Sequence, residues 1–284
     1  MKIIESPEEM QRLALELKAA GKTIGFVPTM GFLHAGHLSL MRTARAKADV
    51  LVASVFVNPT QFGPNEDLEA YPRDLARDET LCEDVGVDYL FYPTPANMYA
   101  DDASVWVDEE RLSSTLCGAA RPGHFRGVCT VVLKLFNIVQ PHFAVFGKKD
   151  AQQLRVLRRM VRDLNIPVEI CAGEIVRESD GLAMSSRNSR LSASERAHAL
   201  CLRAALDRCK AMFEAGERDG VELKVRMREV IERTETATVD YIEIVDDETL
   251  QSLDHIDGKA LVALAVQFAG ARLIDNMELD PADA

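Results

Sequence analysis

Short apolar segments alternate with amphipathic segments along roughly the first 175 residues of the chain. The amphipathic segments carry apolar residues at helical spacing and cover residues 36–48, 74–85, 125–138 and 151–164. The apolar segments are mostly continuous, as in buried strands, and cover residues 22–27, 50–57, 87–92, 142–146 and 168–172. Strands that alternate with helices form βαβ units. The pattern therefore predicts an α/β fold with a doubly wound parallel sheet and helices on both of its faces.

A different pattern begins after the polar stretch at residues 177–189. Ser192 and Glu195 have the spacing of a capping box, which predicts the start of a long helix that runs to about residue 215. A second helix is predicted over residues 221–233, and strand-like segments follow at residues 239–245, 261–268 and 272–277. We therefore predict two domains, a parallel-sheet domain at residues 1–176 and a smaller α+β domain with an antiparallel sheet at residues 177–284.

Charge and composition narrow the classes of partner. The formal net charge of −12 disfavours a nucleic-acid surface, because such a surface has to neutralise phosphates. No apolar run reaches the about 18 residues of a membrane span, and the early acidic residues do not fit a secretory signal. The six cysteines are scattered without a C-x-x-C pair, which is typical of free thiols in a reducing cytosol. We therefore predict a cytoplasmic protein that binds neither nucleic acid nor membrane.

A glycine-punctuated turn follows the first long strand and delivers His34 and His37 to the start of a helix. Helix N-termini carry unpaired N–H groups and partial positive charge, so they bind phosphate. Gly31 and Gly36 allow the backbone to approach an anion closely. A single helical histidine is usually structural, but two on one face can donate to the same phosphates. This motif predicts a nucleotide-triphosphate site.

Two further motifs each allow two interpretations. Asn58 and Gln61 follow the second long strand and offer neutral donors and acceptors for a hydroxyl or carboxylate. A plain turn is equally compatible there, because Asn-Pro and Phe-Gly are turn dipeptides. Residues 121–127 place Arg121, His124 and Arg126 near a helix start, which suits either an anion site or a solvated basic loop.

The last two motifs add cations and hydroxyls. Lys148 and Lys149 follow Gly147 at a strand end, where a helix start disfavours positive charge, and this local conflict favours function. Residues 184–187 combine Met, two serines and an arginine in the polar stretch, which suits a loop that closes on a triphosphate. A surface loop is the alternative for that segment.

In this order, the motifs resemble those of the pantothenate synthetase (pantoate–β-alanine ligase) family, within the HIGH-motif nucleotidyltransferase superfamily. The resemblance covers essentially the whole chain and rests on residues 28–37, 56–62, 121–127, 146–153 and 181–188. It implies a Rossmann-like first domain that binds ATP and pantoate, and a second domain that acts as a lid. It also implies Mg²⁺, a homodimer, and ATP-dependent ligation of pantoate and β-alanine to pantothenate. The implied intermediate is pantoyl adenylate, and the other products are AMP and diphosphate.

The resemblance also implies roles for individual residues. The catalytic residues would be His34, His37 and Lys149. The pantoate and β-alanine site would use Asn58, Gln61 and Gln153. ATP would be bound by Met30, Gly31, His34, Gly36, His37, Gly147, Lys148, Lys149, Asp150, Val176, Met184, Ser185, Ser186 and Arg187. The family commonly has an acidic residue at the position of Lys148. No carboxylate cage is evident in the sequence, which fits a metal held mainly by phosphates.

Two alternatives to this function stay open. One is another HIGH-superfamily nucleotidyltransferase, which Gln61 and Gln153 disfavour because neutral side chains suit a small hydroxy acid. The other is a catalytically silent nucleotide-binding relative. It is disfavoured by the presence of the motif residues His34, His37, Lys149, Ser185, Ser186 and Arg187.

Overall fold

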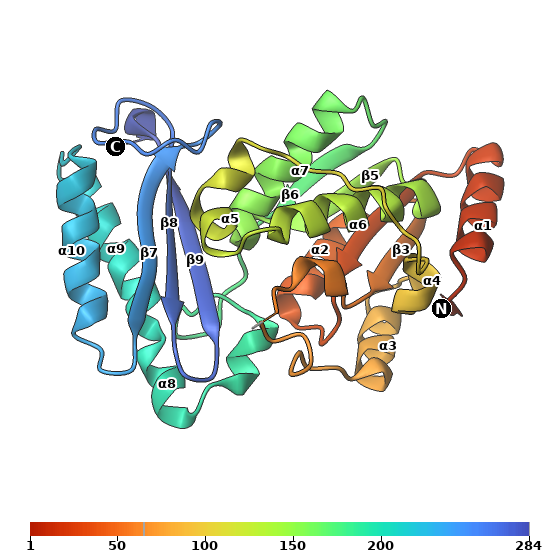
Figure 1. The fold of residues 1–284 in the computed structure, drawn as a ribbon, viewed down its shortest axis with the longest axis horizontal. Helices are drawn as coiled ribbons and strands as arrows, with labels where there is room; N and C mark the ends of the chain where they lie inside the picture. Colours follow the sequence, from red (N-terminus) through yellow and green to blue (C-terminus); the bar gives the residue numbers. More distant parts are fainter. Residues whose placement is uncertain (65, 284) are drawn as a thin grey trace. The chain divides into compact units, whose positions relative to one another are not determined.

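The computed structural model describes residues 1–64 and 66–283, and it divides into two compact units (Figure 1). The first unit comprises Met1–Glu110, Arg121–Lys148 and Gln153–Ile175. The second unit comprises Arg111–Ala120, Lys149–Gln152 and Val176–Ala284. The second unit therefore also takes two short segments from the first 176 residues. Residues 65 and 284, which fall inside the two predicted domain ranges, lie outside the described residues.

The first unit is built on a six-stranded parallel sheet with the order β1-β4-β3-β2-β5-β6. Its strands are β1 (Lys2–Ile4), β2 (Ile24–Thr29), β3 (Val50–Val55), β4 (Tyr89–Phe91), β5 (Phe143–Gly147) and β6 (Glu169–Gly173). The chain proceeds outward from β2 in one direction through β3 and in the other through β5. Ligands bind at such a switch point, beyond the carboxyl ends of the strands. The motifs that follow β2, β3 and β5 all start at this edge.

Helices flank the sheet, so the predicted α/β fold class is confirmed (Figure 1). They are α1 (Pro7–Ala19), α2 (Ala35–Arg45), α3 (Leu75–Asp84), α4 (Pro95–Met98), α6 (His124–Val139) and α7 (Ala151–Asp163), which starts in the second unit. One apolar core joins α2 and α3 to the sheet through residues such as Met41, Cys82, Leu51 and Val27. Elsewhere α1 packs against α6, and both helices contact β2.

The second unit contains a three-stranded antiparallel sheet in the order β7-β8-β9, as predicted. Its strands are β7 (Thr238–Asp246), β8 (Ala260–Gln267) and β9 (Arg272–Leu279), and its helices are α5 (Leu116–Ala120), α8 (Ala193–His198), α9 (Leu200–Glu214) and α10 (Gly220–Glu232). Both α9 and α10 share an apolar core with the sheet. The capping box of Ser192 and Glu195 forms, but the prediction of one long helix is wrong. The helix is interrupted at Ala199, where the Leu202 N–H donates to the Ala199 carbonyl in a tighter turn.

All six cysteines are free thiols, and five of them are buried. Burial raises the pKa of Cys82, Cys129 and Cys209 to about 12, so these thiols stay protonated and inert near neutral pH. Within the described residues, no helix is both long and apolar enough to pass through a membrane.

Candidate active site

The loop between β2 and α2 is held in a single sharp conformation. At the end of β2, the Thr29 hydroxyl donates to the Ser54 carbonyl at 2.7 Å and accepts from the Gly31 N–H at 3.1 Å. Gly31 has φ +83, and a Cβ at this position would lie 2.8 Å from a methyl of Val55. Only glycine fits such a left-handed position beside another strand. The turn thereby directs the chain toward His34.

A buried carboxylate that the sequence did not single out completes this loop. Asp78 of α3 is 1% exposed and accepts from the N–H groups of Phe32 at 2.8 Å and Leu33 at 2.7 Å. Burial raises the pKa of Asp78 above its usual range even though both backbone donors favour the ionised form. One signal was available in the sequence, since Asp78 lies on the buried face of its helix with Leu75 and Cys82.

Asp78→Asn is expected to destabilise the fold by about 1–3 kcal/mol, because an amide presents only one acceptor to two buried N–H groups. Urea unfolding measures the change. Asp84→Asn is the matched control, because this carboxylate is exposed at the end of the same helix. Equal midpoints for both variants would contradict the role given to Asp78.

The two histidines lie against each other at the start of α2. His34 is the N-cap, and its Nδ1 accepts from the Gly36 N–H at 3.1 Å. The Nδ1 of His37 accepts from the His34 N–H at 3.4 Å, and the ring centroids are 4.1 Å apart. A ring nitrogen that accepts an N–H bond carries no proton, so this network assigns the proton of each neutral imidazole to Nε2. Each ring therefore carries a directed donor at the N-terminus of a helix.

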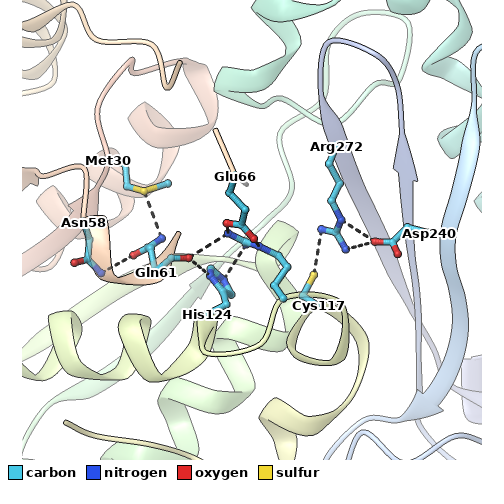
Figure 2. A network of polar contacts seen from close by, with 9 residues as sticks. Met30, Asn58, Gln61, Glu66, Cys117, His124, Asp240 and Arg272 are labelled. Carbon is cyan, nitrogen blue, oxygen red and sulfur yellow. Dashed lines mark hydrogen bonds and ion pairs between the residues drawn. The ribbon is translucent and has the colours of Figure 1, made fainter. Parts of the chain in front are cut away.

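A 3-10 turn after β3 (Pro59–Gln61) carries the predicted acid-binding residues. Asn58 is 1% exposed, and its Oδ1 accepts from the Tyr99 hydroxyl at 2.8 Å. Its Nδ2 donates to the Gly127 carbonyl at 3.2 Å and to Gln61 Oε1 at 3.1 Å. Gln61 Nε2 donates in turn to the sulfur of Met30 at 3.4 Å (Figure 2). A thioether is a weak acceptor, so a carboxylate or hydroxyl oxygen would replace it readily.

The lysine motif after β5 is divided between the two units. Gly147 and Lys148 belong to the first unit, where Lys148 Nζ lies 2.7 Å from Glu174 Oε1. Lys149 belongs to the second unit, and its ammonium lies 3.7 Å from the carboxylate of Asp150. Lys148, Lys149 and Asp150 form a short 3-10 turn that leads into α7. Gln153 of α7 belongs to the first unit and is half-buried.

The segment of Met184, Ser185, Ser186 and Arg187 continues a short hairpin in the second unit. The Met184 N–H donates to the Val176 carbonyl at 3.0 Å, and Arg177 forms a β-bridge with Ala183. Ser185 then caps a 3-10 helix (Ser186–Arg190) by accepting from the Arg187 N–H at 3.3 Å. The segment expected as a polar loop is thus an ordered turn.

Strand β9 supports both predicted nucleotide-binding motifs of the second unit through residues that the sequence analysis missed. Asp275 is buried and binds the guanidinium of Arg177 through two hydrogen bonds of 2.6 and 3.0 Å. The neighbouring Asn276 donates from Nδ2 to the Lys149 carbonyl at 2.8 Å. Adjacent strand residues point to opposite faces, so one strand holds two separate segments.

The site residues therefore fall into two groups. In the first unit Gln61 contacts both Met30 and Asn58, and His34 contacts His37. Lys149, Asp150, Val176 and residues 184–187 belong to the second unit. Among the described residues, no three His, Cys, Asp or Glu side chains are grouped so that they could hold a metal ion.

Comparisons with known proteins identify the family of the chain. The family described as Pantoate-beta-alanine ligase matches residues 2–278. A pantothenate synthetase of Thermotoga neapolitana is 58% identical over 97% of this chain and 99% of its own length. A crystal structure of pantothenate synthetase from Thermus thermophilus is 45% identical, with a TM-score of 0.93 over 99% of this chain and 100% of that chain.

A third relative carries ligands. The crystal structure of a pantoate-beta-alanine ligase from Francisella tularensis, complexed with beta-gamma ATP and beta-alanine, is 32% identical to this chain. Its TM-score is 0.77, and the match covers 98% of this chain and 97% of that one. The family match and the identities extend over nearly the full length of the chain, and the predicted resemblance is confirmed. The chain belongs to the pantoate–beta-alanine ligase family of enzymes.

Proposed function

We propose that the chain joins pantoate to β-alanine in two steps that consume ATP. A carboxylate oxygen of pantoate attacks the α-phosphorus, and the bond to the β-phosphate breaks with release of diphosphate. The amine of β-alanine then attacks the acyl carbon of pantoyl adenylate, and AMP leaves with the former carboxylate oxygen as the amine loses a proton. The observation that carries this proposal is the contact between Gln61 and Met30, which joins the acid-binding motif to the nucleotide-binding loop.

His34 and His37 suit the first step. Two Nε2–H donors and the N-terminus of α2 form a positively polarised surface without a formal charge. Donors that are already oriented stabilise the charge that develops on the leaving diphosphate, without reorganisation during the reaction. We assign Met30, Gly31 and Gly36 to the same ATP-binding surface, and we assign to His37 the contact with the leaving group.

Gln61 suits the acid substrate. Its Nε2–H would exchange the Met30 sulfur for an oxygen of pantoate, and Gln153 would provide further neutral hydrogen bonds. The side chain of Asn58 is buried and fully engaged with Gln61, Gly127 and Tyr99. We therefore assign Asn58 to orienting Gln61, which is a narrower role than the substrate contact implied by the resemblance.

The remaining ATP contacts are assigned to residues around β5 and in the second unit on the resemblance. Lys149 would bind the phosphates, Asp150 the ribose and Val176 the adenine, with Gly147 and Lys148 beside them. The second unit would act as the lid, and it would contact the triphosphate through Met184, Ser185, Ser186 and Arg187. Two hydroxyls and a guanidinium can donate hydrogen bonds to phosphate oxygens.

Mg²⁺, a homodimer and a cytoplasmic location complete the proposal. Mg²⁺ is usually bound through substrate phosphates and one or two carboxylates, so it would enter with ATP and neutralise phosphate charge. The absence of a three-ligand cluster among the described residues fits that mode of binding.

The test of this function is the dependence of AMP formation on each substrate. The protein is incubated with ATP, Mg²⁺, pantoate and β-alanine, and AMP, ADP and pantothenate are measured. We expect AMP and pantothenate in equal amounts, and no AMP when pantoate is omitted. ADP in place of AMP, or AMP formed without pantoate, would refute the proposal.

Asn276→Ala is expected to lower kcat about tenfold by releasing the Lys149 carbonyl, which loosens the lysine that we place on the phosphates. The KM for pantoate should stay unchanged, because this bond from Asn276 goes to the backbone of the motif that we assign to the phosphates. Steady-state AMP formation measures both constants, and Asn97→Ala, an exposed asparagine of α4, is the control. A lower melting temperature with an unchanged kcat would make Asn276 merely structural.

A further inference from the structure

Arg121 of the basic motif at residues 121–127 forms an ion pair within the protein. Arg121 precedes α6, and its side chain is 17% exposed. Its Nε donates to Glu66 Oε1 at 2.7 Å, and a second nitrogen donates to Oε2. Burial raises the pKa of Glu66, but the hydrogen bond and charge of Arg121 outweigh burial and hold the pKa below its usual value. The guanidinium is therefore neutralised by a carboxylate of the same unit.

Arg121 and His124 converge on the backbone carbonyl of Gln61. An Arg121 nitrogen donates to this oxygen at 3.3 Å, and His124 Nδ1 lies 2.9 Å from it. Another Arg121 nitrogen lies 3.1 Å from His124 Nε2. A guanidinium can only donate, so His124 Nε2 accepts and Nδ1–H donates to Gln61. Figure 2 shows Glu66, His124 and Gln61 in this network.

Gly127 and Asn58 also hold the turn that carries Gln61. A Cβ at Gly127 of α6 would lie 2.4 Å from the Thr60 carbonyl, so this glycine allows the turn to lie directly against the helix. Asn58 bonds both the Gly127 carbonyl and the Gln61 side chain. Arg121 and His124 thus hold the backbone of Gln61, and the buried Asn58 orients its side-chain amide. A ligand that uses this amide avoids the entropic cost of ordering it.

We infer that Arg121, Glu66 and His124 are positioning residues for Gln61, and that they set the affinity for the hydroxy acid rather than for ATP. The inference rests on the proposed function, in which Gln61 binds pantoate. These residues act through the Gln61 carbonyl and touch no reacting atom. The basic motif therefore contributes to recognition of the acid indirectly, by positioning Gln61.

The test compares Arg121→Lys, Glu66→Gln and His124→Phe with the wild-type protein. Each variant removes part of the hydrogen-bond network of Arg121, Glu66 and His124, which we call the Gln61 clamp. We therefore expect the KM for pantoate to rise about tenfold. The KM for ATP should stay within about twofold, because Arg121 and His124 act on the carbonyl of Gln61, in the motif that we assign to pantoate. Combining Arg121→Lys with Glu66→Gln should cost little more than either change alone, since both break the same ion pair.

Two further variants separate positioning from folding. His124→Asn keeps a donor at the place of Nδ1, so it should recover part of the affinity that His124→Phe loses. Arg126→Lys is the matched control from the same motif, because Arg126 is exposed and lies over the ring of Trp106 at 4.6 Å. Its constants should equal those of the wild-type protein.

Calorimetric titration of pantoate, with a non-hydrolysable ATP analogue present, measures affinity independently of turnover. Weaker pantoate binding by folded variants supports the inference. Unchanged binding, or a fall in kcat and melting temperature with unchanged KM, overturns it while the proposed function stands. If the wild-type protein forms no pantoate-dependent AMP, the proposed function fails, and this outcome is distinct from failure of the clamp.

Discussion

Replacing His37 by alanine is expected to slow formation of pantoyl adenylate about 10²–10³-fold, the usual effect of removing one oriented donor from a developing anion. The fold should survive, because the hydrogen bond that the His34 N–H donates to His37 Nδ1 is long, at 3.4 Å, and His37 packs on the neighbouring ring of His34. The substitution removes the Nε2–H that we place on the leaving diphosphate. Rapid-quench single turnovers with ATP and pantoate, without β-alanine, isolate this step.

His255→Ala is the control for this experiment. His255 is exposed, lies 3.3 Å from Asp257 in the second unit, and belongs to none of the predicted motifs. We expect its adenylation rate to equal that of the wild-type protein. An unchanged rate in His37→Ala would refute the catalytic role given to His37, whatever the binding constants.

Lys149→Met should reduce the adenylation rate by a similar factor, about 10²–10³-fold, because it removes a charge from the phosphates of the transition state. Methionine keeps the length and apolar stem of the side chain, and the bond from Asn276 to the Lys149 carbonyl does not depend on the side chain. The effect should therefore appear in kcat, with folding intact.

Lys210→Met provides the matched loss of one surface charge, since Lys210 pairs only loosely with Glu214 at 3.7 Å on α9. It should leave adenylation unchanged. Equal rates for Lys149→Met and Lys210→Met would show that the Lys149 ammonium is not required for the step.

The elements that could be predicted are those that a continuous stretch of sequence specifies by itself. The β2 strand, its glycine turn and the His34 cap occupy one continuous segment, and the structure places them as a strand, a turn and a helix start. Apolar periodicity likewise located the parallel and antiparallel sheets. The predicted helix after Ser192 failed at Ala199 because a single change in hydrogen-bond spacing leaves the apolar pattern intact.

The supporting residues of the site could not be predicted because each acts on a distant part of the chain. Asp78 binds a backbone N–H 45 positions away, Arg121 binds a carboxylate 55 positions away, and Asn276 binds a carbonyl 127 positions away. No local pattern specifies such pairs. The composition of residues 121–127 indicated positive charge. It could not show that Glu66 would bind Arg121 and neutralise that charge.

The most direct test of the proposed mechanism follows an oxygen atom. Pantoate labelled with ¹⁸O in its carboxylate is converted with ATP and β-alanine, and the AMP is analysed by mass spectrometry. An adenylate intermediate requires that one carboxylate oxygen leaves with AMP, so we expect AMP that carries a single ¹⁸O. Unlabelled AMP, or label found in diphosphate, would contradict attack of pantoate on the α-phosphorus.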